Sequence, residues 1–515
     1  MYPTSQSVAD AGIRVGGPPR HDGMDGWIPR SGGAILLLTL VMLATRAWEF
    51  GNPAVHVDEQ YYLLVGDRML GGALPYVDLW DRKPVGLFAI FAATRLLPGD
   101  GVLAYQLVAA ALALATAWLV RLCAEKLGAS RAGALAAGAA YLVWLPLLSG
   151  RGGQSPVFYN LFVTGAALLT LGLPALAEGG EWRKILARGA AACLLAGLAI
   201  QTKYTPIVEG AFFGLAHLFY LRRAGASWIV VSAAALLWMT LGALPTLIVV
   251  ADYWHRGPVI FDAFWFANFA SVALRRSYPA AKIAGRLAGT WAQLSPFVIA
   301  GIAFARDGGW PAEKRIAYGW LAAALIAYAM IGAFFDHYAL PLVAPLAIVA
   351  APVLGRRAVY RWVTLVAGAA VFVAKLPTAP YFGSQVRAVS RVVEANSHDR
   401  CPYVFAGDSV VYLLAHACTP TRYAFPSTLA YEPERGATGV DEAAEVRRIL
   451  DTRPPVIVTL SAPLAPWNAA SRALVEMRLR AGYRLVFRAP REEEDMLVYL
   501  RSDLPYIIPV SATAH

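Results

Sequence analysis

Long apolar runs separated by short polar connections fill the first three quarters of the chain. A helix needs about 20 mostly apolar residues to cross a bilayer, and runs of about this length recur here. They predict eleven membrane-spanning helices, at approximately residues 32–49, 103–121, 132–148, 157–177, 186–201, 205–221, 227–250, 287–305, 316–335, 338–354 and 358–376. The pattern therefore predicts a polytopic α-helical membrane protein.

Basic residues indicate which side of the membrane each connection faces. Clusters of Arg and Lys follow every second predicted span, as expected for cytoplasmic loops when the N-terminus is also cytoplasmic. This alternation requires that residues 84–97 form a short interfacial helix rather than a span. We then expect residues 1–31 to be a disordered cytoplasmic segment and the C-terminal tail to be extracytoplasmic. The clusters are Arg121/Lys126/Arg131, Arg183/Lys184/Arg188, Arg222/Arg223, Arg306/Lys314/Arg315 and Arg356/Arg357/Arg361.

Residues 377–515 follow a different pattern, in which short β-rich runs alternate with polar helical segments. This predicts a small extracytoplasmic α/β domain. The turn 407–409 (Gly-Asp-Ser) follows the first β-rich run, and we interpret it as the end of a strand. Cys401 and Cys418 could form a disulfide if the compartment is oxidising. The β-rich runs are 403–405, 456–459, 485–488 and 496–499, and the helical patterns lie near 441–452 and 468–481.

Composition supports a membrane protein and argues against nucleic acid as a partner. Apolar residues make up 58% of the chain and charged residues only 15%, and the mean hydropathy is +0.50, whereas soluble domains carry about 25% charged residues. The net charge is +11, but residues 377–515 contain 15 Arg, no Lys and 15 acidic residues. The positive excess therefore belongs to the membrane part, where it reports topology or the binding of an anionic group.

The first outer loop, residues 50–102, carries charge close to the membrane. Its sequence HVDEQYYLLVGDRMLGGALPYVDLWDRKPVG begins at residue 56. Ionisable groups beside lipid are costly and usually mark chemistry or a ligand. The charged candidates in this loop are Asp58, Glu59, Asp78, Asp81 and Lys83.

Basic residues also occur on the predicted outer side, where they are normally sparse. Lys203 lies at the outer end of a span, and several more lie in the 251–286 loop. Such a cationic group suits an anionic ligand, above all phosphate. The alternative is that these side chains reach lipid headgroups. The basic residues of the loop are Arg256, Arg275, Arg276, Lys282 and Arg286.

Together these residues suit the transfer of a sugar from a donor carried by the membrane, such as a polyprenyl phosphate sugar. A carboxylate must deprotonate the acceptor hydroxyl, and cations must stabilise the departing phosphate. Asp58 or Glu59 would be the base. Lys83, Lys203 and the 275–286 arginines would bind the phosphate, and the spans would hold the lipid.

At these residues the chain resembles the GT-C glycosyltransferases, which use polyprenyl phosphate sugars. The nearest relatives are glycosyltransferase family 39, which is protein mannosyltransferase-like, and the lipid A aminoarabinose transferases. AGLAIQTKYTP, FFDHYALPLVAPLAI and VFAGDSVVYLLAHACTPTRYAFP resemble further family segments, and the resemblance covers nearly the whole chain from residue 33. ALPYVDLWDRKP matches the family pattern pY-x-D-x-x-D-x-K-P-P at Pro75, Tyr76, Asp78, Asp81, Lys83 and Pro84.

The resemblance implies a fold, a location and a set of roles. Residues 32–376 would form the transmembrane catalytic domain of a multi-pass bacterial inner-membrane protein, with a periplasmic active site and a periplasmic C-terminal domain. The enzyme would transfer the sugar with inversion from an undecaprenyl-type phosphate to a lipid, glycan or protein. Asp58 matches the catalytic base, with Glu59 supporting or replacing it. The residues expected to bind the donor phosphate or substrate are Lys83, Asp81, Asp78, Lys203, Arg275, Arg276, His337 and Tyr338.

The sequence departs from the family pattern in two places. Val85 replaces the second proline of K-P-P, and the loop 149–160 contains Gln154 and Asn160 but no carboxylate, although many relatives carry an acid there. Asp58 and Glu59 must therefore do more of the chemistry. We expect no cofactor and no metal ligands, although His56, Asp58, Glu59 and Asp81 leave a divalent cation as an alternative.

Structural roles and other functions compete with this interpretation. Asp58 could cap a helix that begins at Glu59, the acids of residues 78–81 could merely neutralise Arg82 and Lys83, and His337 could be an ordinary interfacial histidine. A lipid-linked-sugar transporter or flippase predicts charges inside the spans and broken helices in repeated halves. A non-catalytic subunit that binds a lipid phosphate is a further alternative. The charges gather at one face and no repeat is seen, which favours the transferase.

Overall fold

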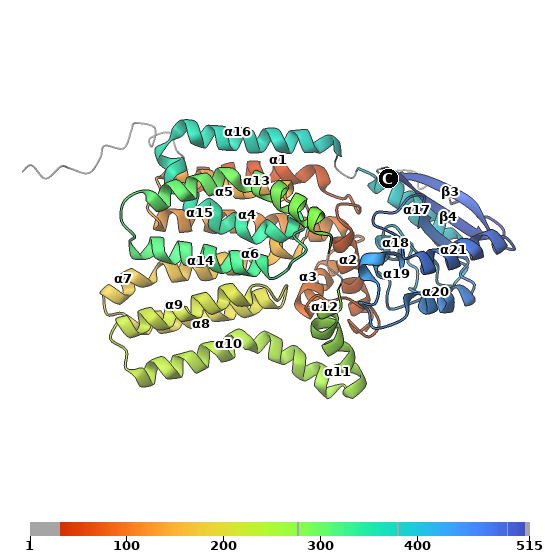
Figure 1. Ribbon diagram of the computed structural model, residues 1–515, viewed down its shortest axis with the longest axis horizontal. Coiled ribbons are helices and arrows are strands. Elements are labelled where there is room, and N and C mark those ends of the chain that lie inside the picture. Colours follow the sequence, from red (N-terminus) through yellow and green to blue (C-terminus); the bar gives the residue numbers. More distant parts are fainter. Residues whose placement is uncertain (1–30, 276–277, 379–380, 492, 510–515) are drawn as a thin grey trace, which may run out of the picture.

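A computed structural model describes residues 31–275, 278–378, 381–491 and 493–509. A bundle of long helices and a smaller C-terminal domain lie end to end, and the short helices of the outer loops lie between them (Figure 1). Except for its last residue, the predicted cytoplasmic segment 1–31 lies outside the described residues.

A helix of the bundle coincides with each of the eleven predicted spans. Seven segments have the length and apolar composition for a membrane crossing: Gly32–Glu49, Val102–Lys126, Ser155–Glu178, Trp228–His255, Ala280–Arg306, Asp336–Arg356 and Ala358–Lys375. The helices over the other four predicted spans are shorter or less apolar, so their crossing of the membrane stays a prediction. They are α5 (Arg131–Leu147), α8 (Trp182–Ile200), α9 (Ile207–Arg223) and α14 (Ala312–Ala329). The bundle consists of α1 (Ser31–Arg46), α4 (Val102–Lys126), α5 (Arg131–Leu147), α6 (Ser155–Leu171), α7 (Leu173–Glu178), α8 (Trp182–Ile200), α9 (Ile207–Arg223), α10 (Trp228–His255), α13 (Ala280–Arg306), α14 (Ala312–Ala329), α15 (Leu340–Arg356) and α16 (Ala358–Lys375).

Small residues allow the central helices to approach closely. Helix α5 is rich in Ala and Gly and is buried along nearly its whole length between α15 and α4. A Cβ atom at Gly138 would lie 2.8 Å from the carbonyl oxygen of Ala117 in α4. Close backbone contact of this kind is the usual basis of helix packing in membranes. Lipid tails are as apolar as the side chains, so the hydrophobic effect does not drive helices together there.

The two large outer loops fold into short helices at the end of the bundle that faces the C-terminal domain (Figure 1). The first loop forms α2 (Val57–Leu70) and α3 (Val85–Arg95). At 11 residues, α3 is about 16 Å long and cannot cross a hydrocarbon core of about 30 Å, which confirms the interfacial interpretation of residues 84–97. The second loop forms α11 (Pro258–Trp265), a π-helical segment (Phe266–Ala270) and α12 (Ser271–Ala273).

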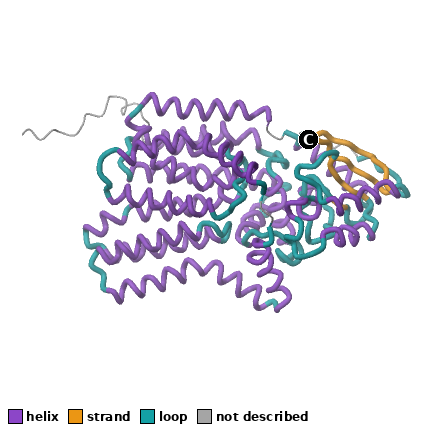
Figure 2. Tube along the Cα trace, in the orientation of Figure 1, coloured by secondary structure: helices purple, strands orange, loops and turns teal. Residues whose placement is uncertain are grey.

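The C-terminal domain is a four-stranded mixed sheet with helices packed around it, as the alternating pattern predicts. The strand order is β1-β2-β4-β3, in which β1 and β2 are parallel and the other pairs antiparallel; Figure 2 shows the long β3–β4 hairpin at the far end. A disulfide joins Cys401 and Cys418. The elements are α17 (Gly383–Asn396), β1 (Tyr403–Val404), α18 (Val410–Leu414), α19 (Ser427–Ala430), α20 (Glu442–Asp451), β2 (Val456–Leu460), α21 (Ala469–Gly482), β3 (Tyr483–Arg491) and β4 (Glu494–Arg501).

Candidate active site

Asp58 lies in the first turn of α2, at the end of the helix bundle. The residue that caps this helix is His56, whose Nδ1 accepts a hydrogen bond from the backbone N–H of Asp58 at 3.2 Å. The interpretation of Asp58 as the cap is therefore wrong. The Gln154 side-chain amide also lies 2.7 Å from the same Nδ1. The Asp58 carboxylate sits where the helix dipole favours negative charge.

Basic side chains gather around the Asp58 carboxylate. Burial opposes its charge, but His56, Lys83, His337 and Lys203 outweigh this effect and lower the pKa of Asp58 to about 2. The side chain is only partly buried, so it can meet a ligand. Segments that are far apart in the chain therefore meet around Asp58.

Glu59 has a different environment, although it is the next residue. Its side chain is completely buried and lies against Gly152, where any Cβ atom would collide with the carboxylate. Burial raises the pKa of Glu59 to about 7, although a backbone N–H of Gly153 and the charge of Arg46 act in the opposite direction. Arg46 also donates hydrogen bonds to the carbonyl groups of Gly150 (2.9 Å) and Gly152 (2.5 Å). Glu59 is therefore part of a packed cluster under α2.

Asp81 and Lys83 form one structural unit. Asp81 Oδ1 accepts hydrogen bonds from the backbone N–H groups of Arg82 (2.5 Å) and Lys83 (3.2 Å) and lies 3.9 Å from Lys83 Nζ. Burial of the Lys83 ammonium group is outweighed by Asp81 and Asp58, so the pKa of Lys83 is raised. Lys83 is thus a charged side chain whose backbone is fixed by Asp81, beside Asp58.

Asp78 lies apart from this unit and faces solvent. Its carboxylate accepts a hydrogen bond from the backbone N–H of Leu74 at 2.6 Å, which closes the preceding turn. The structure therefore gives Asp78 a local backbone contact and does not place it with the cations.

Lys203 and the segment 336–339 complete the cluster. Lys203 Nζ lies 4.5 Å above the ring of Tyr338, and the ring of His337 is 5.4 Å from that of His56, measured between centroids. Burial and the neighbouring charge of Lys83 lower the pKa of Lys203 to about 7. An anion bound here would gain two ammonium groups, at Lys83 and Lys203, within one partly enclosed region.

Arg275 approaches the cluster from the second outer loop, but the C-terminal domain also contacts it. Glu434 accepts hydrogen bonds from Arg275 Nη2 at 2.9 Å and from Arg82 Nη1 at 2.8 Å. Arg82 additionally donates to Ser271 Oγ at 3.2 Å. Glu434 thus ties both outer loops to the C-terminal domain, which no sequence signal indicated. Arg276 lies outside the described residues.

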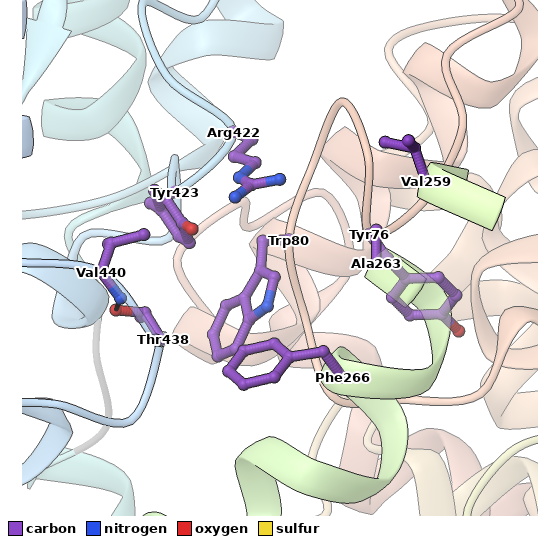
Figure 3. Close-up of a pocket in the computed structure, with 10 residues that line it drawn as sticks. Tyr76, Trp80, Val259, Ala263, Phe266, Arg422, Tyr423, Thr438 and Val440 are labelled. Atoms are coloured by element: carbon purple, nitrogen blue, oxygen red, sulfur yellow. Dashed lines mark hydrogen bonds between the residues drawn. The ribbon is translucent and has the colours of Figure 1, made fainter. Parts of the chain in front are cut away.

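A cavity of about 290 Å³ lies on another side of the loop that carries Lys83 (Figure 3). Trp80 stands between Tyr423 and Arg422 of the C-terminal domain and Phe266 of the second outer loop. The backbone N–H of Trp80 donates to the Arg422 carbonyl at 2.8 Å, and the Tyr76 hydroxyl donates to the Lys83 carbonyl at 2.6 Å. The loop backbone is therefore held in place from both sides.

Metal binding finds no support from clustered ligands in the described part of the chain. Among residues 31–275, 278–378, 381–491 and 493–509, no group of three or more His, Cys, Asp or Glu side chains is placed to hold a metal ion.

Comparison with known proteins identifies the fold. No family model matches the sequence, and no curated protein matches it. The structure resembles that of ArnT from Cupriavidus metallidurans bound to undecaprenyl phosphate, with a TM-score of 0.60, 12% identity and coverage of 91% of this chain and 98% of that chain. ArnT in the apo state gives a TM-score of 0.58, 13% identity and coverage of 92% and 98%. The chain therefore has the GT-C type fold that the sequence resemblance implies, over nearly its entire length.

Proposed function

We propose that the protein is an inverting glycosyltransferase that moves a sugar from a polyprenyl phosphate, of the undecaprenyl type, to an acceptor hydroxyl outside the cytoplasm. The observation that carries this proposal is the Asp58 carboxylate, which lies at the outer end of a membrane bundle with Lys83 and Lys203 near enough to lower its pKa. The bound undecaprenyl phosphate in the similar ArnT structure supports the choice of donor.

The residues suit a single displacement. Lys83, Lys203 and Arg275 would hold the donor phosphate, with C1 of the sugar facing Asp58. The acceptor oxygen attacks C1 while the bond from C1 to the phosphate oxygen breaks, and its proton passes to Asp58. The phosphate leaves with the bonding electron pair, and the ammonium groups stabilise its added charge. One carboxylate suffices because no covalent sugar–enzyme intermediate forms and because a phosphate stabilised by cations leaves without being protonated.

The donor itself would adjust the strength of the base. The surrounding basic side chains hold the pKa of Asp58 at about 2, which makes it a weak proton acceptor. A phosphate that pairs with Lys83 and Lys203 neutralises part of this field, so the pKa of Asp58 rises toward its usual range. A base is most effective when its pKa is near the working pH. Asp58 would therefore be a stronger base beside a bound donor.

Neighbouring residues would support these groups. Asp81 orients Lys83 by accepting a hydrogen bond from the Lys83 backbone N–H. The Lys203 ammonium group packs against the ring of Tyr338. Glu59 is too deeply buried to meet an acceptor hydroxyl, and we assign it to the support of α2. The disulfide of Cys401 and Cys418 suits an oxidising compartment. This supports a periplasmic C-terminal domain and active site, with a cytoplasmic N-terminus in the bacterial inner membrane.

The experiment that tests the proposal is the Asp58→Asn substitution. Membranes containing the protein are incubated with undecaprenyl phosphate carrying a labelled hexose or pentose, and transfer to envelope acceptors is measured. We expect transfer to fall by about 10²–10⁴-fold, the usual contribution of a general base, while binding of undecaprenyl phosphate to the purified protein persists. Asp399→Asn, which alters an exposed carboxylate of the C-terminal domain, is the control. Wild-type transfer by Asp58→Asn would contradict the assignment.

A further inference from the structure

A buried carboxylate, Asp408, lies where the C-terminal domain meets α2. It lies in the turn 407–409, four residues after the end of β1, and it is fully buried. Asp408 Oδ1 accepts a hydrogen bond from Gln60 Nε2 at 2.7 Å, and Oδ2 accepts from Arg491 Nε at 3.0 Å. Arg491 also pairs with Glu494 of β4. The turn that the sequence assigns to a strand end thus holds a charged group in contact with the first outer loop.

Gln60 places this contact close to the proposed base. It follows Asp58 by two residues in the first turn of α2, and only 2% of its surface is exposed. A displacement of the Gln60 amide therefore moves the helical turn that carries the Asp58 carboxylate. Its contact with Asp408 acts directly on the orientation of that turn.

The C-terminal domain also holds the other end of α2. Arg68, near the end of the helix, donates a hydrogen bond to the Ala417 carbonyl at 2.6 Å. The next residue, Cys418, is fixed by its disulfide to Cys401. The domain therefore contacts both ends of the helix, through Asp408 at the end that carries Asp58 and through the Ala417 carbonyl at the other.

Burying charged groups at this contact costs free energy, which would be unnecessary if the contact only attached the C-terminal domain to α2. Asp408, Glu494 and Arg491 bring two carboxylates and one guanidinium into the interior, and their side chains are exposed by 7% or less. Charged groups buried in this way cost free energy that an apolar contact would avoid. In return, directional hydrogen bonds allow one geometry where apolar contacts allow several. A role in orientation accounts for the cost.

We propose that Asp408 is a positioning residue of the active site. Through Gln60 it fixes the first turn of α2 and with it the direction of the Asp58 carboxylate, so the C-terminal domain is a working part of the catalytic unit. The kinetic consequence rests on the glycosyl transfer proposed above, whereas the structural coupling between residues 408 and 60 does not.

An exchange of the two side chains tests the proposal. Gln60→Glu sets two carboxylates against each other, and we expect kcat to fall about ten- to hundred-fold, the cost of a displacement of about 1 Å, with the KM for donor unchanged. Part of kcat should return at low pH, where a protonated Glu side chain can again donate. The double variant Gln60→Glu/Asp408→Asn restores an amide–carboxylate pair and should recover most of kcat. Asp399→Asn is the control.

Hydrogen exchange of residues 57–70 provides a readout that needs no substrate. Gln60→Glu should accelerate exchange in the first turn of α2, and the double variant should slow it again. Unchanged exchange and kcat in Gln60→Glu, or a double variant no better than Gln60→Glu, would overturn the proposal. If the wild-type protein transfers no sugar while the exchange pattern behaves as expected, the proposed function fails and the coupling stands.

Discussion

At the scale of the residue, the titration of Lys203 links the pH to donor binding. Its pKa of about 7, set by burial and by Lys83, means that near neutral pH only part of the molecules carry this charge. A bound phosphodiester favours the charged form. We therefore expect the KM for donor to rise as the pH increases through 7, because the free protein loses its proton. Lys203→Arg stays charged and should abolish this rise in initial-rate measurements; an equally steep rise in that variant would contradict the assignment.

Glu59 should influence stability rather than chemistry. Burial raises its pKa to about 7 in the folded protein from an ordinary value of 4.5. Between these two values the folded state holds a proton that the unfolded chain releases, so stability decreases as the pH rises across this window. Glu59→Gln should remove this decrease in melting temperature, measured in detergent from below pH 5 to above pH 7, and should keep sugar transfer within about tenfold of wild type. Loss of transfer comparable to that of Asp58→Asn would instead make Glu59 a chemical group.

The charged members of the site could be predicted because their positions are costly. Asp58, Lys83 and Lys203 carry charge beside long apolar runs, and such residues persist at a membrane surface chiefly for ligands or chemistry. Gln154 and Glu434 gave no comparable signal. A neutral amide or a carboxylate in a soluble domain is unremarkable in a sequence, and their roles come from contacts between segments far apart in the chain.

At the scale of the element, the separation between α2 and α3 determines where Asp58 lies. A Cβ atom at Gly66 would lie 2.6 Å from the backbone nitrogen of Ala92 and 2.8 Å from the carbonyl carbon of Phe91. Because backbone cannot move aside as a side chain can, Gly66→Ala should push the two helices apart, at a cost of about 1–3 kcal/mol. We expect a lower melting temperature together with reduced transfer. Gly285→Ala in α13, where no atom lies within 4 Å, should change neither.

Elements with one strong pattern were predicted well. The apolar runs gave the long helices, and the alternating runs of the tail gave the four strands and two of its helices. The helix α17 and the π-helical segment at 266–270 were missed. Mixed polar and apolar sequence is compatible with several local structures, and tertiary contacts select among them: Asn268, in the π-helical segment, accepts a hydrogen bond from the Tyr204 hydroxyl at 2.7 Å.

At the scale of the whole molecule, the site lies where the helix bundle and its outer loops meet the C-terminal domain. The bundle contributes Lys203 and the 336–339 segment, the first outer loop contributes Asp58 and Lys83, and the C-terminal domain holds both outer loops through Glu434. A sequence reveals each unit by its own pattern, but it does not reveal how the units dock. This is why the members of the site could be named in advance while the contacts that orient them could not.

The orientation of the protein in the membrane is the remaining prediction at this scale. If the basic loops are cytoplasmic, an exposed residue of the tail and an exposed residue at the end of α7 must lie on opposite sides. Glu493→Cys and Glu178→Cys place a thiol at such positions, and the free Cys123 and Cys193 are buried. A membrane-impermeant maleimide should label the thiol at 493 in intact spheroplasts and the thiol at 178 only after permeabilisation. The reverse order would place Asp58 on the cytoplasmic side, where nucleotide sugars are available and the argument for a lipid-linked donor would lose its basis.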